Sequence, residues 1–319
     1  RSDYDLNNDR NGGCYCESCA NCGQVLLAWR MARLKGDADS VDEMERALYN
    51  GVCHGISADG TDIYYPNPLI DQNTPRYNNW VCCPPALFRS VAGMGRFIYG
   101  WKDNDIWINL FVASNCTFAL NNGNVPLAVS TNGYPWDGRV TITVTPASAT
   151  NFTMRIRMPG WCRNALVRLN NKVIAKPTIT NRYVVISRTW SNGDQVIFNM
   201  AMPPMRVEAH PSVSADTGRV CIQRGPIIFA LEGTDNGGGG LQDFAISSNP
   251  NLQATYDAGL LGGVEKITAN KQGGGTLTFV PWFATARRGY SWQRVWVLQE
   301  GKTVRSTGWN DRLYREYTP

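Results

Sequence analysis

Apolar residues in the first hundred positions recur at the spacing of helices. From about Glu17 to Leu34 they return every three or four residues, and Gly36-Asp37 ends that pattern. A capping box, Ser40-Val41-Asp42-Glu43, predicts a second helix that runs to about Val52. A third helix is predicted from Cys82-Cys83-Pro84-Pro85 to about Tyr99, because proline is favoured in the first turn of a helix.

The stretch between the second and third helices has a different pattern. Asp59-Gly60 is typical of a hairpin turn. Tyr64-Tyr65-Pro66-Asn67-Pro68 predicts an edge strand or an irregular segment, since proline lacks the backbone donor that a central strand needs. Residues 1–100 are therefore expected to be helical with a short β insertion.

Beyond Trp101 the apolar period changes from helical to alternating, which indicates strands. Turn residues at Asn132-Gly133, Asn170-Asn171 and Asn192-Gly193-Asp194 separate these strands at regular spacing, as in a β-sandwich. The run Gly237–Gly240 is predicted to be a flexible surface loop, because no strand–loop–helix frame surrounds it. The predicted strands are Ile106–Phe111, Arg139–Val144, Phe152–Met158, Leu166–Leu169, Tyr183–Ser187, Gln195–Met200, Arg219–Ile222, Ile227–Leu231, Leu277–Val280 and Arg294–Leu298.

These patterns predict a multidomain α+β chain. Residues 1–100 form its helical domain, residues 101–210 a β-sandwich, and residues 211–319 a second β-rich domain. A chain of 319 residues is long enough for two or three domains with sizeable cores.

Composition and charge argue against two classes of partner. The net charge is +5, but the basic residues are scattered and form no dense run, so we expect no nucleic-acid groove. No stretch of 18 apolar residues occurs, so we expect no transmembrane helix and no membrane partner. The 11 tryptophans and 13 tyrosines suit sugar-stacking surfaces, but they suit a β-sandwich core equally well.

Cysteine is unusually frequent. Seven of the ten cysteines lie within the first 83 residues. This usage is typical of exported proteins with disulfides, so we expect a secreted, extracellular or periplasmic protein. Cys14, Cys16, Cys22 and Cys53 are interpreted as disulfide partners or buried thiols, and a Cys22–Cys53 bridge between the first two helices stays open.

Four residues form a candidate metal site. Cys82 and Cys83 do not suit a disulfide with each other, because the Cβ vectors of adjacent residues diverge. Their place at a helix N-terminus favours the thiolate form. Glu17 and Cys19 can direct one oxygen and one sulfur to a shared point. Three thiolates and one carboxylate suit tetrahedral zinc, while disulfides or free thiols remain the alternatives.

The sequence begins Arg1-Ser2-Asp3-Tyr4, with neither a methionine nor a signal peptide. We therefore expect this chain to start inside a longer protein.

A set of short motifs, taken together in order and spacing, resembles glycoside hydrolase family 127, the β-L-arabinofuranosidase family. Each motif is weak alone, but together they span about residues 4–300. They are Cys16-Glu17-Ser18-Cys19-Ala20, Ala47-Leu48-Tyr49-Asn50-Gly51-Val52, Tyr64-Tyr65-Pro66-Asn67-Pro68-Leu69, Cys82-Cys83-Pro84-Pro85, Tyr134-Pro135-Trp136-Asp137-Gly138, Arg157-Met158-Pro159-Gly160-Trp161-Cys162, Trp190-Ser191-Asn192-Gly193-Asp194 and Arg224-Gly225-Pro226.

The resemblance implies a fold and a mechanism. It implies an (α/α) barrel catalytic domain, of which residues 1–100 would be the C-terminal portion, followed by all-β sandwich domains. It implies zinc held by Glu17, Cys19, Cys82 and Cys83, with Cys82 as the nucleophile and Tyr65 as a sugar contact. A cysteine nucleophile would form a thioglycosyl intermediate that water hydrolyses with retention. The scheme requires Cys82 to loosen from the zinc as it attacks.

The resemblance also implies that one catalytic residue lies outside this sequence. The family's general acid/base glutamate lies upstream of the Glu-x-Cys motif and would fall before Arg1. We therefore expect an upstream N-terminal segment, or a separate chain, to complete the barrel. Ala86 stands where the family often has asparagine, so the sugar subsite nearest the nucleophile is expected to differ.

Three functions stay open at this level. The first is a retaining glycosidase that acts on β-L-arabinofuranosides or related sugars of plant-type glycans. The second is a non-catalytic structural or carbohydrate-binding β-rich protein, which predicts no hydrolysis even with the upstream region restored. The third is one chain of a cleaved two-chain enzyme, which predicts that an N-terminal fragment co-purifies. A homo-oligomer is compatible with each.

Overall fold

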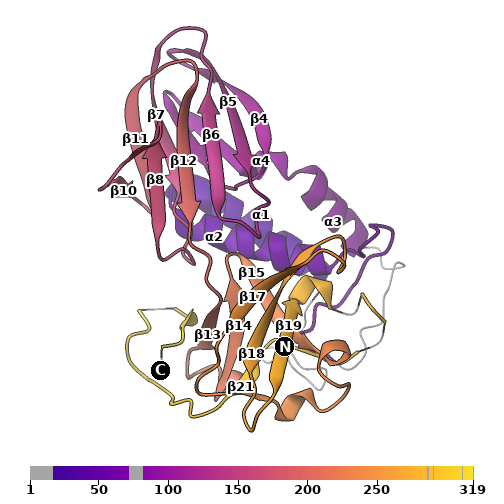
Figure 1. Cartoon of the computed structure of the whole chain (residues 1–319). Coiled ribbons are helices and arrows are strands. Elements are labelled where there is room, and N and C mark those ends of the chain that lie inside the picture. Colours follow the sequence, from indigo (N-terminus) through magenta and orange to yellow (C-terminus); the bar gives the residue numbers. More distant parts are fainter. Residues whose placement is uncertain (1–16, 72–81, 286, 290, 311, 319) are drawn as a thin grey trace. The chain divides into compact units, whose positions relative to one another are not determined.

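The computed structural model describes residues 17–71, 82–285, 287–289, 291–310 and 312–318 (Figure 1). The chain divides into two compact units, neither of which is one continuous stretch. The first unit combines Arg1–Cys22, Leu48–Leu87 and Pro203–Pro319, and the second combines Gly23–Ala47 with Phe88–Met202. Strands dominate both, and the α-helices of the described residues lie within the first hundred positions.

The first two helices follow the predicted order with one correction. Helix α1, Ser18–Lys35, ends before Gly36, whose φ of +64° suits glycine at a helix end, as predicted. Helix α2, Ala38–Arg46, begins earlier than the predicted capping box at Ser40. Its cap is Asp37, whose carboxylate accepts a hydrogen bond from the Ser40 amide at 3.1 Å. The turn continues as a π-helix, Ala47–Val52.

The predicted third helix exists but is interrupted. Helix α3 covers Cys83–Ala92, and a short helix α4 covers Gly95–Ile98. The break falls at Gly93, where an added Cβ would lie 2.8 Å from the Arg89 carbonyl oxygen. The prediction of one helix to Tyr99 was therefore wrong, because apolar spacing continues across a backbone break that it does not register.

Two sheets form the β-sandwich of the second unit (Figure 1). The alternation that predicts strands is real: in β6 the inward residues Val140, Ile142 and Val144 are fully buried. One sheet has the order β10-β11-β7-β3-β2 and the other β4-β5-β6-β12-β8-β9. The strands are β2 Tyr99–Lys102, β3 Asp105–Ile108, β4 Ser114–Leu120, β5 Gly123–Thr131, β6 Arg139–Val144, β7 Thr150–Arg157, β8 Ala165–Leu169, β9 Lys172–Val173, β10 Thr178–Thr180, β11 Tyr183–Trp190 and β12 Asp194–Met200.

Side chains from the two sheets meet in a shared aromatic core. Tyr99 packs edge-on against Phe118 with ring centroids 5.3 Å apart, and Phe111 lies 5.9 Å from Phe198. Strands β2, β4 and β5 were not predicted: the third helix was predicted to run to about Tyr99, where β2 begins, and the alternation in β5 was overlooked. The predicted turns at Asn170-Asn171 and Gly193 are confirmed by positive φ angles at all three residues.

The first unit contains a sheet of 11 strands with one main path, β16-β21-β14-β15-β19-β18-β17. The predicted strand Arg294–Leu298 is in fact two, β20 and β21, which pair with different partners. The strands are β1 Ile70–Asp71, β13 Met205–Ala209, β14 Arg219–Arg224, β15 Ile227–Glu232, β16 Ala245–Ile246, β17 Gln253–Asp257, β18 Val264–Asn270, β19 Thr276–Pro281, β20 Gln293–Arg294, β21 Val297–Gln299 and β22 Tyr314–Glu316.

The segment between the π-helix and α3 joins this sheet. Its turn at Asp59-Gly60 is confirmed, with the Gly60 amide donating to the Ser57 carbonyl at 3.0 Å. The proline-rich stretch is irregular as predicted, and then pairs through β1 with β20 of the sheet. No helix among the described residues is both long and apolar enough to cross a membrane.

Candidate metal centre and active site

The N-terminal ends of α1 and α3 carry the four predicted metal ligands. Glu17 immediately precedes α1 and Cys19 lies in its first turn. Cys83 is the first residue of α3, and the carbonyl of Cys82 accepts a hydrogen bond from the Ala86 amide at 3.4 Å. The prediction that the cysteine pair lies at a helix N-terminus is therefore confirmed.

The structure brings these four side chains together. One donor atom from each of Glu17, Cys19, Cys82 and Cys83 lies within 4.8 Å of every other. The Cys19 Sγ lies 3.9 Å from the Cys82 Sγ, which in turn lies 3.9 Å from the Cys83 Sγ. Two sulfurs bound to one zinc at about 2.3 Å and a tetrahedral angle are about 3.8 Å apart. The thiol spacing therefore fits a zinc ion.

The carboxylate is closer to its neighbour than such a site requires. The Cys19 thiol donates a hydrogen bond to Glu17 Oε1, with sulfur and oxygen 2.6 Å apart, so a proton lies between these two candidate ligands. A cation would take the place of that proton, since metal binding to thiols releases protons. The donor set, three soft sulfurs and one carboxylate oxygen, suits zinc.

Exposure separates the two adjacent cysteines. Cys82 is exposed, whereas Cys83 is 1% exposed. Glu17 and Cys19 are half-buried. Cys82 is therefore the accessible member of the pair.

Burial opposes the thiolate form in two of the cysteines. Burial is the largest cause that raises the pKa of the Cys19 thiol, and the hydrogen bond to Glu17 adds to it. Burial also raises the pKa of Cys83. Burial thus works against the thiolate form that the helix N-terminus favours at Cys83. A bound cation would favour the thiolate, because a coordinating thiol is deprotonated.

Tyr65 lies beside this cluster. Burial raises the pKa of its phenol, and the negative charges that Cys82 and Cys83 can carry raise it further. The Tyr65 carbonyl accepts a hydrogen bond from the amide of Ser18, 2.9 Å away. The predicted sugar contact is thus tied to the residue between two ligands.

The other cysteine predictions have mixed outcomes. Cys53 is a free thiol, so the Cys22–Cys53 disulfide is not formed. Cys53 is half-buried, and burial raises the pKa of its thiol to about 11. Cys14 and Cys16 lie outside the described residues.

Sequence reasoning missed two buried polar residues near the site, Ser18 and Asn67. Ser18 is 0% exposed and Asn67 is 2% exposed. Both stand inside motifs noted for other residues, Cys-Glu-Ser-Cys and Tyr-Pro-Asn-Pro. Two signals could have revealed them: Ser18 is a polar residue at the start of an apolar helix, and Asn67 is a polar residue between two prolines.

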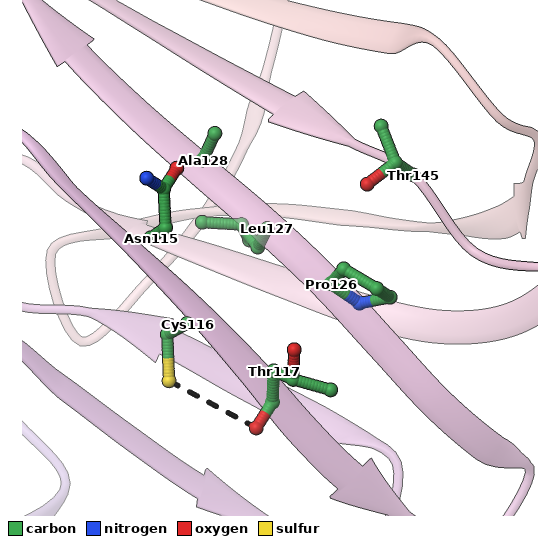
Figure 2. A pocket seen from close by; sticks show the side chains of 7 residues that line it. All are labelled: Asn115, Cys116, Thr117, Pro126, Leu127, Ala128 and Thr145. Carbon is green, nitrogen blue, oxygen red and sulfur yellow. Dashed lines mark hydrogen bonds between the residues drawn. The ribbon is translucent and has the colours of Figure 1, made fainter.

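Two surface hollows lie apart from the cluster. Figure 2 shows one on the sheet of β4 and β5, where the Cys116 thiol contacts its neighbour's carbonyl and no charged side chain lines the hollow. The other lies beside the loop Gly237–Gly239 and Trp292. The predicted surface loop is exposed at these three glycines.

Comparison with known families and structures shows which family the chain belongs to. Family models match three consecutive stretches: the GH127 catalytic domain of β-L-arabinofuranosidase at residues 1–96, its GH127 middle domain at 105–202, and the glycoside hydrolase family 127 C-terminal domain at 204–298. Together they cover most of the chain. The chain belongs to glycoside hydrolase family 127, and the resemblance in the sequence motifs is confirmed.

Individual relatives are longer than this chain. A non-reducing end β-L-arabinofuranosidase from Bifidobacterium longum subsp. longum is 30% identical over 288 residues, which is 83% of this chain and 42% of that protein. The crystal structure of a GH127 β-L-arabinofuranosidase from Geobacillus stearothermophilus T6 superposes with a TM-score of 0.87 at 34% identity, covering 93% of this chain and 52% of that one. A GH127 β-arabinofuranosidase structure gives 0.84 at 30% identity, covering 90% and 50%. The chain spans about half the length of these relatives.

Proposed function

We propose that this chain carries the nucleophile and the metal site of a retaining glycoside hydrolase that acts on β-L-arabinofuranosides or related sugars of plant-type glycans. The observation that carries the proposal is the Glu17, Cys19, Cys82 and Cys83 cluster, in which Cys82 alone is exposed. Relatives named as β-L-arabinofuranosidases support the substrate class.

In this proposal the four cluster residues hold zinc. The ion would favour thiolates at neutral pH, against the burial that raises the pKa of both Cys19 and Cys83. Cys83 and Cys19 then act as anchors, since buried or half-buried sulfur cannot approach a sugar. A thiolate is a stronger nucleophile than a thiol, so the same condition activates Cys82.

The chain's own residues account for the first bond change. The Cys82 sulfur attacks the anomeric carbon, a C–S bond forms, and the bond to the leaving oxygen breaks. Water then displaces the sulfur, so two inversions give retention. The Tyr65 phenol, held beside the cysteines, orients the sugar. The proton that the leaving group needs comes from a general acid in an upstream segment or chain.

Exposed apolar residues on the helices support such a partner. Leu27 and Leu34 on α1 are 57% and 81% exposed, and Phe88 and Val91 on α3 are 62% and 48% exposed. Helices that carry such side chains in the (α/α) barrel of this proposal would bury them against the missing half. We accordingly assign residues 1–100 to the barrel, 101–210 to the middle β-sandwich and 211–319 to the C-terminal β domain. We place the whole protein outside the cytoplasm.

The test combines metal analysis with two matched serine variants. We expect about one zinc per chain in the wild type. In the complete protein, Cys82→Ser should abolish hydrolysis of an aryl β-L-arabinofuranoside, with metal weakened but detectable, because three ligands remain. Cys83→Ser should lower zinc content at least as much, since it removes the buried anchor.

Two outcomes would count against the proposal. A wild-type chain that contains no zinc and has its cysteines in disulfides leaves a non-catalytic β-rich module. A Cys82→Ser enzyme that keeps full activity removes Cys82 as the nucleophile. Co-purification of an N-terminal fragment would instead identify a two-chain enzyme with the same chemistry.

A further inference from the structure

Ser18 lies between the proposed ligands Glu17 and Cys19, and both its hydroxyl and its amide are hydrogen-bonded. Its side chain is fully buried and its hydroxyl donates to the Tyr64 carbonyl. Its amide donates to the Tyr65 carbonyl at 2.9 Å, and Glu17 forms a β-bridge with Pro66. The Glu17–Cys19 segment is therefore bonded to the segment that carries Tyr65, and the two move together.

Asn67 adds a second set of contacts to these two segments. Its Oδ1 lies 2.8 Å from the Nδ1 of His54 and 3.4 Å from the Ser18 hydroxyl oxygen. Its Nδ2 donates to the Gly51 carbonyl at 3.3 Å. Because an amide oxygen can only accept, His54 donates from Nδ1, which sets its tautomer. One buried amide thus links the ligand segment, the Tyr65 segment and the π-helix.

The C-terminal sheet holds the far end of the network. The His54 ring stacks on Trp282 with centroids 4.7 Å apart and an interplanar angle of 26°. The Trp282 indole donates to the Pro68 carbonyl at 3.1 Å, and the Gln293 amide donates to the same oxygen at 2.9 Å. All these residues lie in one compact unit.

We propose that Asn67 and His54 are positioning residues, which hold the Glu17–Cys19 ligand pair and the Tyr65 phenol in fixed relation, with Trp282 as their anchor. This inference rests on the proposed function of the same site. Neither residue touches the reacting atoms. They act through Ser18 and the Tyr64–Pro66 backbone, as outer groups that orient metal ligands do in other proteins.

The geometry favours positioning over simple core filling. An apolar core needs no polar chain, and burying an amide and an imidazole is costly unless both are bonded. Here the His54 Nδ1 bonds to the Asn67 amide oxygen, which also lies near the hydroxyl of Ser18, the residue between Glu17 and Cys19. Losing outer contacts of this kind commonly lowers metal affinity or activity by about 10–100-fold.

The experiment measures cobalt(II) binding to the 319-residue chain by its thiolate charge-transfer absorption, with a competing chelator. Asn67→Ala removes the central amide. His54→Phe keeps a ring on Trp282 but removes the Nδ1 donor. The matched control is Phe279→Leu, a fully buried change in β19 of the same sheet that removes none of the hydrogen bonds described above. In the complete protein the same variants are compared for KM and kcat.

We expect both variants to weaken cobalt binding about tenfold. We also expect their KM to rise, because Tyr65 shifts with the tether, while Phe279→Leu lowers only the melting temperature. Wild-type cobalt affinity and KM in folded Asn67→Ala and His54→Phe would overturn the inference and leave the proposed function standing. Equal weakening in Phe279→Leu would overturn it too, since general destabilisation would then explain the effect. A wild type that binds no cobalt would overturn the proposed function as well.

Discussion

At the scale of single residues, Arg157 shows how a fully buried charge is stabilised. Its guanidinium is 0% exposed and pairs with Asp42 and Glu45. Glu45 also accepts hydrogen bonds from the Tyr134 hydroxyl at 2.6 Å and from the Trp161 indole at 3.2 Å. Burial by itself would lower the pKa of Arg157, but the two carboxylates raise it. The charge is therefore retained inside the second unit.

Removing Arg157 should be costly because its partners would stay buried and charged. We expect Arg157→Ala to lower the free energy of unfolding by about 3–5 kcal/mol. Arg155, on the same strand β7, pairs with Asp105 where both side chains are about a quarter exposed. Arg155→Ala should cost at most about 1 kcal/mol. Urea unfolding of the two variants makes the comparison, and equal losses would show that Arg157 contributes no more than a surface pair.

At the scale of elements, the N-terminal end of α1 depends on a close approach by Gly55. A Cβ at Gly55 would lie 2.5 Å from the Ser18 hydroxyl oxygen and 3.2 Å from a methyl carbon of Leu87. Gly23, inside α1, meets nothing within 4 Å and is exposed. Gly55 is therefore needed for close packing between segments, whereas packing places no such requirement on Gly23.

Alanine should have opposite effects at these two glycines. Gly55→Ala must displace Ser18, so we expect a lower melting temperature and weaker zinc binding. Gly23→Ala should stabilise the protein by up to about 1 kcal/mol, because alanine is the better helix former. Thermal unfolding with zinc titration separates the two. If Gly55→Ala matches the wild type in both, the close approach is unimportant.

At the scale of the whole molecule, the unit with the candidate site draws on three separate stretches of chain. Glu17 and Cys19 come from one, Tyr65, Cys82 and Cys83 from another, and Trp282 from the third. The stability of the C-terminal sheet is therefore part of the stability of the site. The stability of this unit should depend on pH through Asp216, in the 3₁₀ turn Ser214–Asp216.

Asp216 should make folding less favourable as the pH rises. Burial raises the pKa of its carboxyl to about 7, against the opposing charges of Arg219 and Arg294. Below about pH 4 both folded and unfolded forms hold the proton, so the group has no effect. Between about pH 4 and 7 only the unfolded form ionises, so stability falls, and above about pH 7 the loss is complete.

The measurement is thermal unfolding of the wild type and Asp216→Asn across this range. The variant cannot ionise, so its advantage over the wild type should grow from pH 4 to pH 7 and then level off. One pKa unit corresponds to about 1.4 kcal/mol. Parallel curves for the two proteins would show that Asp216 does not titrate in this range.

Local sequence patterns determined much of this protein. Apolar spacing, Gly36 and the Cys-Cys-Pro-Pro start located α1 and the beginning of α3, because helix periodicity and end signals act over a few residues. Asparagine and glycine pairs located the sandwich turns for the same reason. The ordered motifs were enough to identify the family. The break at Gly93 and the cap at Asp37 were missed, since each depends on contacts that spacing does not encode.

Tertiary structure decided which residues form the site and how they differ. Cys19 and Cys82 are 63 positions apart in the chain and only 3.9 Å apart at their sulfurs. The exposure of Cys82 beside a buried Cys83, and the burial that raises the pKa of Cys83, depend on what packs around α3. Ser18 and Asn67 acquire their roles only where distant segments meet. The burial of a residue and the meeting of distant segments depend on how the whole chain packs, so no local sequence pattern predicts them.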